Sequence, residues 1–197
     1  NAEQCSYIHE LNASAERMRD LVNALLQVSR LEGGGIHMKA REVDIETYLG
    51  EVTDEVRSIA KEHNVSVELQ VPSRVGALRT DPTLLSIVLQ NVLSNAVKYS
   101  KKEGRVVIVA KRQGSALEII IEDTGIGIPR ADQQNVFQKL FRAQNVRVLD
   151  TTGSGLGLYI SKMVMATLGG SISLKSTENR GTTVVIRLPL RVRKGRE

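Results

Sequence analysis

The sequence predicts an α/β protein: a two-layer α/β sandwich preceded by a long coiled-coil-like helix. Residues 4–32 repeat apolar side chains at the spacing of a helix that pairs with another helix, and a triple glycine ends that pattern. Beyond the glycines, helix-like and strand-like segments alternate without a regular strand–helix–strand repeat, which favours two packed layers. With 197 residues, 41% of them hydrophobic, the chain is long enough to bury a core.

The first element is a helix over residues 4–32. Its apolar residues alternate between spacings of three and four: Ile8, Leu11, Ala15, Met18, Val22 and Leu25, with Leu21 and Val28 beside them. This narrow stripe is typical of a coiled-coil or bundle seam. Because no second long seam follows, we expect residues 1–35 to serve dimerisation or docking.

Residues 36–190 are expected to form a compact domain. Asp81 and Pro82 supply an N-cap and a first-turn proline, which open a helix that runs to about Tyr99. The other expected elements are a short strand within 35–45, a helix over 45–63, strands over 65–71, 105–112 and 116–123, a short helix after Pro129, a polar segment 142–152, a helix over about 156–168, and a hairpin of 171–176 with 182–190. Residues 191–197 are expected to be a solvated basic tail.

The composition excludes several classes of protein. The formal net charge of +5 lies largely in the basic tail, and 3% aromatic residues argue against base stacking, so we expect no nucleic-acid partner. The single cysteine, Cys5, excludes an internal disulfide and fits a reducing compartment. No apolar run is long enough to cross a bilayer. Since the chain begins at Asn1 without a methionine, we expect a cytoplasmic portion of a longer protein, with any membrane anchor outside it.

The stretch "TTGSGLGLYISK", residues 151–162, indicates a phosphate site. A glycine-rich turn that leads into a helix brings backbone N–H groups and the positive end of the helix dipole together. The spacing G-x-G-x-G does not match the dinucleotide fingerprint, and no P-loop string is present. Those two classes of phosphate site are therefore excluded.

Two further clusters indicate what accompanies the phosphate. "IEDTGIGIP" ends a strand at Asp123, whose carboxylate suits an exocyclic amine such as that of adenine and not a phosphate. Asn91 and Asn95 lie four residues apart on one helical face, with Lys98 three further on. Amide oxygens suit a magnesium ion that keeps several waters and bridges phosphates. Each cluster alone also fits a structural use, as surface amides or a turn; their joint order favours ATP with Mg²⁺.

The chain resembles the sensor histidine kinases of two-component systems. Four of its motifs occur in the order of their N, G1, F and G2 boxes: residues 91–100, "DTGIGIP" (123–129), "VFQKLFRA" (136–143) and "GSGLGLYI" (153–160). The segment "LLQVSRLEGG" resembles the second helix of their dimerisation and phosphotransfer hairpin. The resemblance implies a Bergerat ATP-binding fold, with a mixed sheet covered by helices, as in gyrase, Hsp90 and MutL.

The resemblance also implies roles in ATP and Mg²⁺ binding for individual residues. Asn95 is the expected magnesium ligand, assisted by Asn91, and Asp123 takes the adenine amine. The other residues expected to contact the nucleotide are Lys98, Tyr99, Gly125, Gly127, Ile128, Phe141, Gly153, Ser154, Gly155, Leu156, Gly157 and Thr182.

The resemblance further implies a mobile lid over the triphosphate. Phe137 and Phe141 are expected to anchor it, and Arg142 to reach the γ-phosphate. The expected catalytic residues are Asn91, Lys98 and Arg142. The sequence departs from the family pattern at Gln138 and Leu140, where an acid and an aromatic residue are common.

Asn91 favours transfer over hydrolysis. ATP-hydrolysing relatives place a glutamate there to activate water, and an amide cannot act as a general base. His9 stands in a "His-Glu-Leu" string like that of the acceptor box, but the basic residue and proline that follow in the family are missing. We therefore expect His9, like His37 and His63, to be an ordinary surface residue, and the acceptor histidine to lie outside this chain.

The sequence leaves three functions to compare. The first is the catalytic part of a sensor histidine kinase, whose implied partners are its own dimerisation helices, in a full-length homodimer, and a response regulator receiver domain. The second is an ATP-binding regulatory module of the same fold without phosphotransfer. The third, an ATPase of the gyrase type, is disfavoured by Asn91.

Overall fold

The computed structural model describes residues 2–33, 38–72, 75–149 and 153–190. The basic tail 191–197 and His37, for which a solvated tail and a surface residue are expected, lie outside the described residues. Within them, no helix combines the length and the apolar character that a membrane span requires.

The domain is built on a mixed five-stranded sheet in the order β2-β4-β5-β7-β6. The strands are β2 (Ser66–Gln70), β4 (Arg105–Gln113), β5 (Ala116–Asp123), β6 (Ser171–Thr177) and β7 (Gly181–Pro189). The β2–β4 pair is parallel, whereas the other neighbours are antiparallel. A separate two-stranded sheet pairs β1 (Arg41–Asp44) with β3 (Ala77–Thr80).

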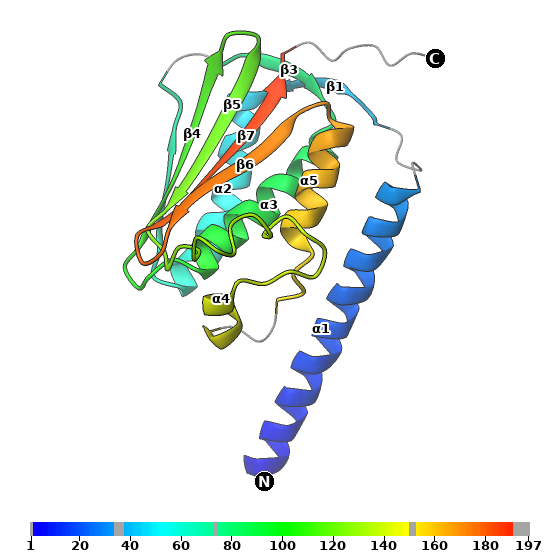
Figure 1. Cartoon of the computed structure of the whole chain (residues 1–197), viewed down its shortest axis with the longest axis vertical. Helices are drawn as coiled ribbons and strands as arrows, with labels where there is room; N and C mark the ends of the chain where they lie inside the picture. Colours follow the sequence, from blue (N-terminus) through cyan, green and yellow to red (C-terminus); the bar gives the residue numbers. More distant parts are fainter. Residues whose placement is uncertain (1, 34–37, 73–74, 150–152, 191–197) are drawn as a thin grey trace.

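Three helices cover one face of the large sheet (Figure 1): α2 (Ile45–Glu62), α3 (Pro82–Lys98) and α5 (Gly157–Thr167). Fully buried residues of α3, among them Leu85 and Leu89, pack in one hydrophobic core with the inward-facing residues of the sheet, such as Ile108 and Ile119. The predicted two-layer α/β sandwich is therefore confirmed.

The helix starts follow from capping chemistry. Asp81 precedes α3 and accepts hydrogen bonds from the backbone N–H groups of Thr83 and Leu84, at 3.0 and 3.2 Å, while Pro82 occupies the first turn. Asp44 caps α2 in the same way, through the N–H of Thr47. The predicted start of α3 is thus confirmed.

The long first helix, α1 (Ala2–Glu32), is confirmed as a helix that ends before the glycines. It runs beside α5 and contacts the domain through its C-terminal part (Figure 1), where Val28 is 2% exposed. Its exposed apolar side chains include Met18, Val22 and Leu25. Pairing of this face with another helix stays a prediction.

Two local expectations are wrong. Residues 130–140 form successive turns and no helix, because Asp132, Asn135 and Gln138 each donate a backbone hydrogen bond to the carbonyl three residues earlier. A helix instead lies in the expected polar segment: α4 (Gln144–Leu149). Its first N–H, that of Gln144, bonds to the carboxylate of Asp132 at 2.9 Å, a tertiary contact that local sequence does not reveal.

Strand β3 is an addition to the expected elements. It has only four residues, and just Leu78 and Thr80 are buried, so its alternation is too short to stand out in the sequence.

Candidate functional site

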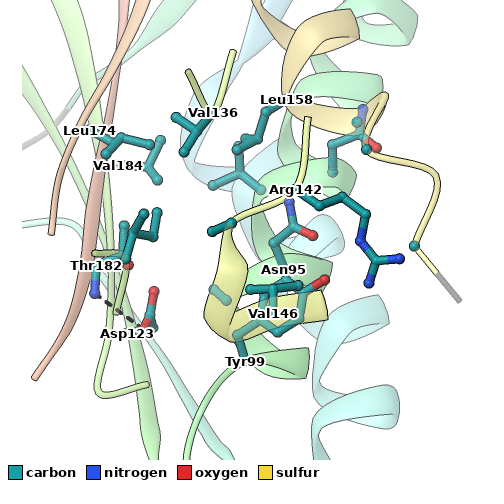
Figure 2. A pocket seen from close by; sticks show the side chains of 18 of the residues that line it. Asn95, Tyr99, Asp123, Val136, Arg142, Val146, Leu158, Leu174, Thr182 and Val184 are labelled. Atoms are coloured by element: carbon teal, nitrogen blue, oxygen red, sulfur yellow. Dashed lines mark hydrogen bonds between the residues drawn. The ribbon is translucent and has the colours of Figure 1, made fainter. Parts of the chain in front are cut away.

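A cavity of about 260 Å³ lies between α3, the adjoining ends of β5 and β7, and the segment that leads to α5. Figure 2 shows Asp123 and Thr182 on one side and Asn95, Tyr99 and Arg142 on the other. The residues predicted for the site that line it are Asn91, Asn95, Tyr99, Asp123, Gly127, Ile128, Phe141, Arg142, Gly153, Ser154, Gly155, Gly157 and Thr182. Residues far apart in the sequence thus meet around one cavity.

Asp123 is the buried carboxylate of the site, at the end of β5. Its Oδ1 accepts backbone hydrogen bonds from Gly125 and Thr182, at 2.8 and 3.2 Å. Among the described residues Oδ2 accepts none, so that oxygen is left for a donor in the cavity. Burial raises the pKa of Asp123 to about 6, while the two backbone hydrogen bonds act to lower it.

Thr182 is tied into the same wall. Its register partner across β5 and β7 is Asp123, and its hydroxyl lies 2.9 Å from that of Ser176. The Ser176 hydroxyl also accepts from the backbone N–H of Ile128, at 2.8 Å. This network holds the turn after β5 against the β6–β7 hairpin.

Two glycines let that turn pass close to its neighbours. A Cβ at Gly125 would collide with the backbone oxygen of Tyr99, the residue after α3. A Cβ at Gly127, whose φ is 63°, would collide with the backbone oxygen of Thr177. Gly125 itself does not line the cavity. It lets the turn pack closely against the end of α3.

The α3 wall presents amide side chains. Asn91 and Asn95 are four residues apart on one face of the helix, and both line the cavity together with Tyr99. The Oδ1 of Asn91 lies 3.2 Å from the position that a Cβ on Gly157 would occupy. The first turn of α5 is therefore next to this amide.

The phosphate-loop candidate closes the third side. α5 begins at Gly157 without a side-chain cap, and Leu156, its N-cap residue, is fully buried. Gly155 has a φ of 69°, and a Cβ on it would lie 2.8 Å from the backbone of Leu140 and Phe141. The glycine loop thus packs directly on the segment that contains Phe141.

Besides Gly125, three predicted residues lie away from the cavity lining. Lys98 is exposed, with its Nζ 5.8 Å from the centroid of the Tyr99 ring. Leu156 belongs to the core, and Phe137 is half-buried outside the lining. Their roles toward a nucleotide stay predictions.

The side chains of the site can supply only some of the ligands of a magnesium ion. Among the described residues, no group of three or more His, Cys, Asp or Glu side chains is arranged to bind a metal. The amides of Asn91 and Asn95 are neutral oxygen ligands that suit Mg²⁺ when phosphates and waters complete its shell. A metal at this site therefore fits together with a phosphate ligand.

The sequence reasoning missed the apolar wall of the cavity, which consists of Val92, Ala96, Ile121, Ile126, Val136, Ala143, Val146, Leu158, Leu174 and Val184. Part of it was open to prediction. Ile121 lies two residues before Asp123, and Val184 two after Thr182, so the alternation of a strand puts them on the same face as the polar pair. The side chains from α4 and β6 carry no such signal.

Comparison with known proteins gives a consistent result. Residues 80–192 match the family described as "Histidine kinase-, DNA gyrase B-, and HSP90-like ATPase". The sensor-like histidine kinase SenX3 of Mycobacterium tuberculosis (strain H37Rv) is 37% identical over 175 residues, covering 89% of this chain and 42% of that protein. The sensor histidine kinase WalK of Bacillus subtilis (strain 168) is 34% identical over 176 residues, covering 88% of this chain and 29% of that protein.

Solved structures agree. The structure of full-length ShkA in complex with AMPPNP has a TM-score of 0.82 at 27% identity, covering 96% of this chain and 39% of that chain. The mycobacterial sensor histidine kinase MprB has a TM-score of 0.67 at 30% identity, covering 76% and 97%. This chain spans less than half of SenX3 and of WalK, and the matched region contains every residue that lines the cavity. The chain therefore belongs to the family of histidine kinase-, DNA gyrase B- and HSP90-like ATPases, and within it the ATP-binding domain is that of the sensor histidine kinases.

Proposed function

We propose that this chain binds ATP in the described cavity and transfers the γ-phosphoryl group to a histidine of a dimerisation hairpin. The observation that carries the proposal is the meeting of a buried carboxylate, two amides and a glycine loop around one cavity. Each is suited to a different part of MgATP. They come from segments far apart in the sequence, from Asn91 on α3 to Gly157 at the start of α5.

The adenine is proposed to lie against β5 and β7. Asp123 offers Oδ2 to an exocyclic amine, and Thr182 beside it offers a hydroxyl for a direct or water-mediated contact. The apolar side chains of Ile121 and Val184 flank them and suit the faces of a purine. Tyr99 and Ile128 are proposed to line the nucleoside.

The phosphates are proposed to extend toward α5. Its uncapped N-terminus, with Gly153, Ser154 and Gly155 before it, provides backbone N–H groups for an anion. Asn95, assisted by Asn91, is the proposed ligand of a magnesium ion, which when bound neutralises phosphate charge. Arg142 and Lys98 are proposed to add positive charge at the phosphates.

Asn91 supports transfer over hydrolysis. Its amide cannot accept a proton from water in the way that a carboxylate does. The site is therefore proposed to position ATP for an incoming imidazole and to leave water without a base.

The acceptor and the partners follow from the relatives. SenX3 and WalK are histidine kinases, so we propose a response regulator receiver domain as the downstream partner and a homodimer as the state of the longer protein, acting on the cytoplasmic side. The side chains of His9 and His37 lie outside the described residues, and His63 is exposed at the C-cap of α2, away from the cavity lining. The acceptor is proposed to lie on a hairpin helix that this chain does not contain.

The test is phosphotransfer in trans. The chain is incubated with γ-labelled ATP, Mg²⁺ and the purified dimerisation hairpin of SenX3, and labelled protein is tested for acid lability. We expect acid-labile label on the hairpin, and about tenfold less of it with Asp123→Asn when ATP is limiting. ATP binding with no label on the hairpin would favour the regulatory module, and acid-labile label on this chain alone would point to His9.

A further inference from the structure

Asn145 makes a contact that links α4 to the turn after β5. It is the second residue of α4, and its Nδ2 donates a hydrogen bond to the carbonyl oxygen of Gly127 at 2.8 Å. Gly127 lines the cavity, as do Ala143 and Val146 on either side of Asn145. The amide therefore joins two walls of the site, α4 and the turn after β5, that lie apart in the sequence.

The Gly127 turn is fixed from its other side. The backbone N–H of Asn179, in the β6–β7 turn, bonds to the oxygen of Ile126 at 2.7 Å. The side chain of Gln133 bridges the oxygens of Ile128 and Ser176, both at 2.9 Å. The turn is thus bonded to β6 and to the β6–β7 turn, and Asn145 joins α4 to it.

The second amide atom of Asn145 argues against a purely stabilising role. Its Oδ1 is buried and accepts no hydrogen bond from the described residues. A buried polar atom without a partner costs stability, which an apolar side chain of the same size would avoid. What the amide supplies here is the hydrogen bond from its Nδ2 to the carbonyl oxygen of Gly127.

A second contact fixes the start of α4 without using a side chain of the helix. The backbone N–H of Gln144 bonds to Asp132 at 2.9 Å, whereas the Gln144 side chain is exposed. Replacing that side chain leaves the backbone contact in place. Gln144 is therefore a matched control for Asn145.

We propose that Asn145 is a positioning residue that clasps α4 over the cavity and so slows the departure of bound nucleotide. The inference rests on the proposed function, because it takes ATP as the occupant of the cavity. Asn145 acts through Gly127 and α4, which place Ile128, Ala143 and Val146 against the ligand.

The experiment measures nucleotide dissociation by stopped flow, with an ATP that carries a fluorescent group on its ribose, in the presence of Mg²⁺. Asn145→Asp places a carboxylate oxygen against the Gly127 carbonyl, and Asn145→Leu removes both amide groups at similar volume. We expect both to raise the dissociation rate about five- to tenfold with little change in the association rate. Gln144→Ala is expected to match the wild type.

The melting temperature separates positioning from folding. Asn145→Leu is expected to melt within about 2 °C of the wild type, since it removes an unpartnered buried atom while it breaks the clasp. A lower binding amplitude with an unchanged dissociation rate would mean fewer folded sites and would overturn the proposal, as would unchanged rates in both variants. Wild-type protein that fails to bind the labelled ATP would instead refute the proposed function itself.

Discussion

At Asp123, folding favours the neutral carboxyl group, whereas the proposed ligand contact favours the ionised one. Burial raises its pKa from 3.8 to about 6, so the folded protein holds the ionised carboxylate at a cost when the pH is neutral. The same ionised oxygen is what the proposed adenine contact requires. Stability and binding are therefore expected to respond in opposite directions when the charge is removed.

Asp123→Asn tests this opposition. The amide oxygen keeps the acceptor for Gly125 and Thr182, while the charge is lost, so we expect the free energy of unfolding at pH 7.5 to rise by about 1–3 kcal/mol. ATP affinity is expected to fall at least about tenfold, because an NH₂ group meets the adenine amine. Urea unfolding and calorimetry measure the two effects.

The stability gained by Asp123→Asn is expected to depend on pH. An aspartate whose pKa is raised by folding makes the folded state lose stability as the pH rises from 3.8 through about 6. The advantage of Asp123→Asn is thus expected to vanish at pH 4 and below. Glu51→Gln, which removes an exposed carboxylate of α2 that does not act on Asp123, serves as the control. An advantage of Asp123→Asn that persists at low pH would contradict the electrostatic cause.

Binding of adenosine is predicted to weaken in acid. Adenosine carries no phosphate that titrates, so its affinity reports on the protein. As the pH falls below about 6, Asp123 becomes protonated and no longer offers a free acceptor, and the dissociation constant is expected to rise about tenfold by pH 5. Fluorescence competition across pH 5–8 measures it; a flat profile would remove Asp123 from base recognition.

Among the elements, we expect α3 to depend on its N-cap more than α2 does. Asp81 is 5% exposed and accepts three backbone hydrogen bonds, from Thr83, Leu84 and Lys39. Asp44, the cap of α2, accepts a hydrogen bond from the backbone N–H of Thr47 at an exposed position. Asp81 therefore fixes both the start of α3 and the segment before β1.

Asp81→Ala is expected to lower the free energy of unfolding by about 2–3 kcal/mol, since it removes a cap and leaves buried N–H groups unpaired. Asp44→Ala is expected to cost about 1 kcal/mol. Urea unfolding of the two variants side by side measures the difference. Equal losses would show that burial of the Asp81 cap adds nothing.

The helices and turns also show which features can be predicted from the sequence. Asp81-Pro82 predicts the start of α3 because capping depends on residues adjacent in the sequence. Asn91 and Asn95 are predicted to share a face because residues four apart lie on the same side of a helix. The turns after Pro129 and helix α4 were missed because tertiary contacts, such as Asp132 with Gln144, decide them. The apolar lining of the cavity was missed for the same reason wherever it comes from α4.

At the scale of the whole molecule, α1 carries two apolar stripes. Ala24, Val28 and Leu31, spaced by four and three, pack toward the domain, and the Glu32 carboxylate accepts from the hydroxyl of Tyr159 at 2.8 Å. Met18, Val22 and Leu25 repeat with the same spacing but are 63%, 55% and 45% exposed. Val28, expected beside the seam, thus belongs to the docked stripe, whereas the other stripe is exposed.

Self-association through the exposed stripe is the prediction at this scale. The chain is expected to form a concentration-dependent dimer in sedimentation velocity, because covering each apolar side chain stabilises the pair by about 1.5–3 kcal/mol at most. Val22→Glu is expected to shift the equilibrium toward monomer and to leave ATP affinity unchanged, since Val22 is outside the cavity lining. Gln27→Glu adds a charge to the same helix away from that stripe and is expected to dimerise like the wild type. If the wild type stays monomeric at every concentration, the stripe needs further residues of the longer protein in order to pair, and α1 alone is not the dimerisation element.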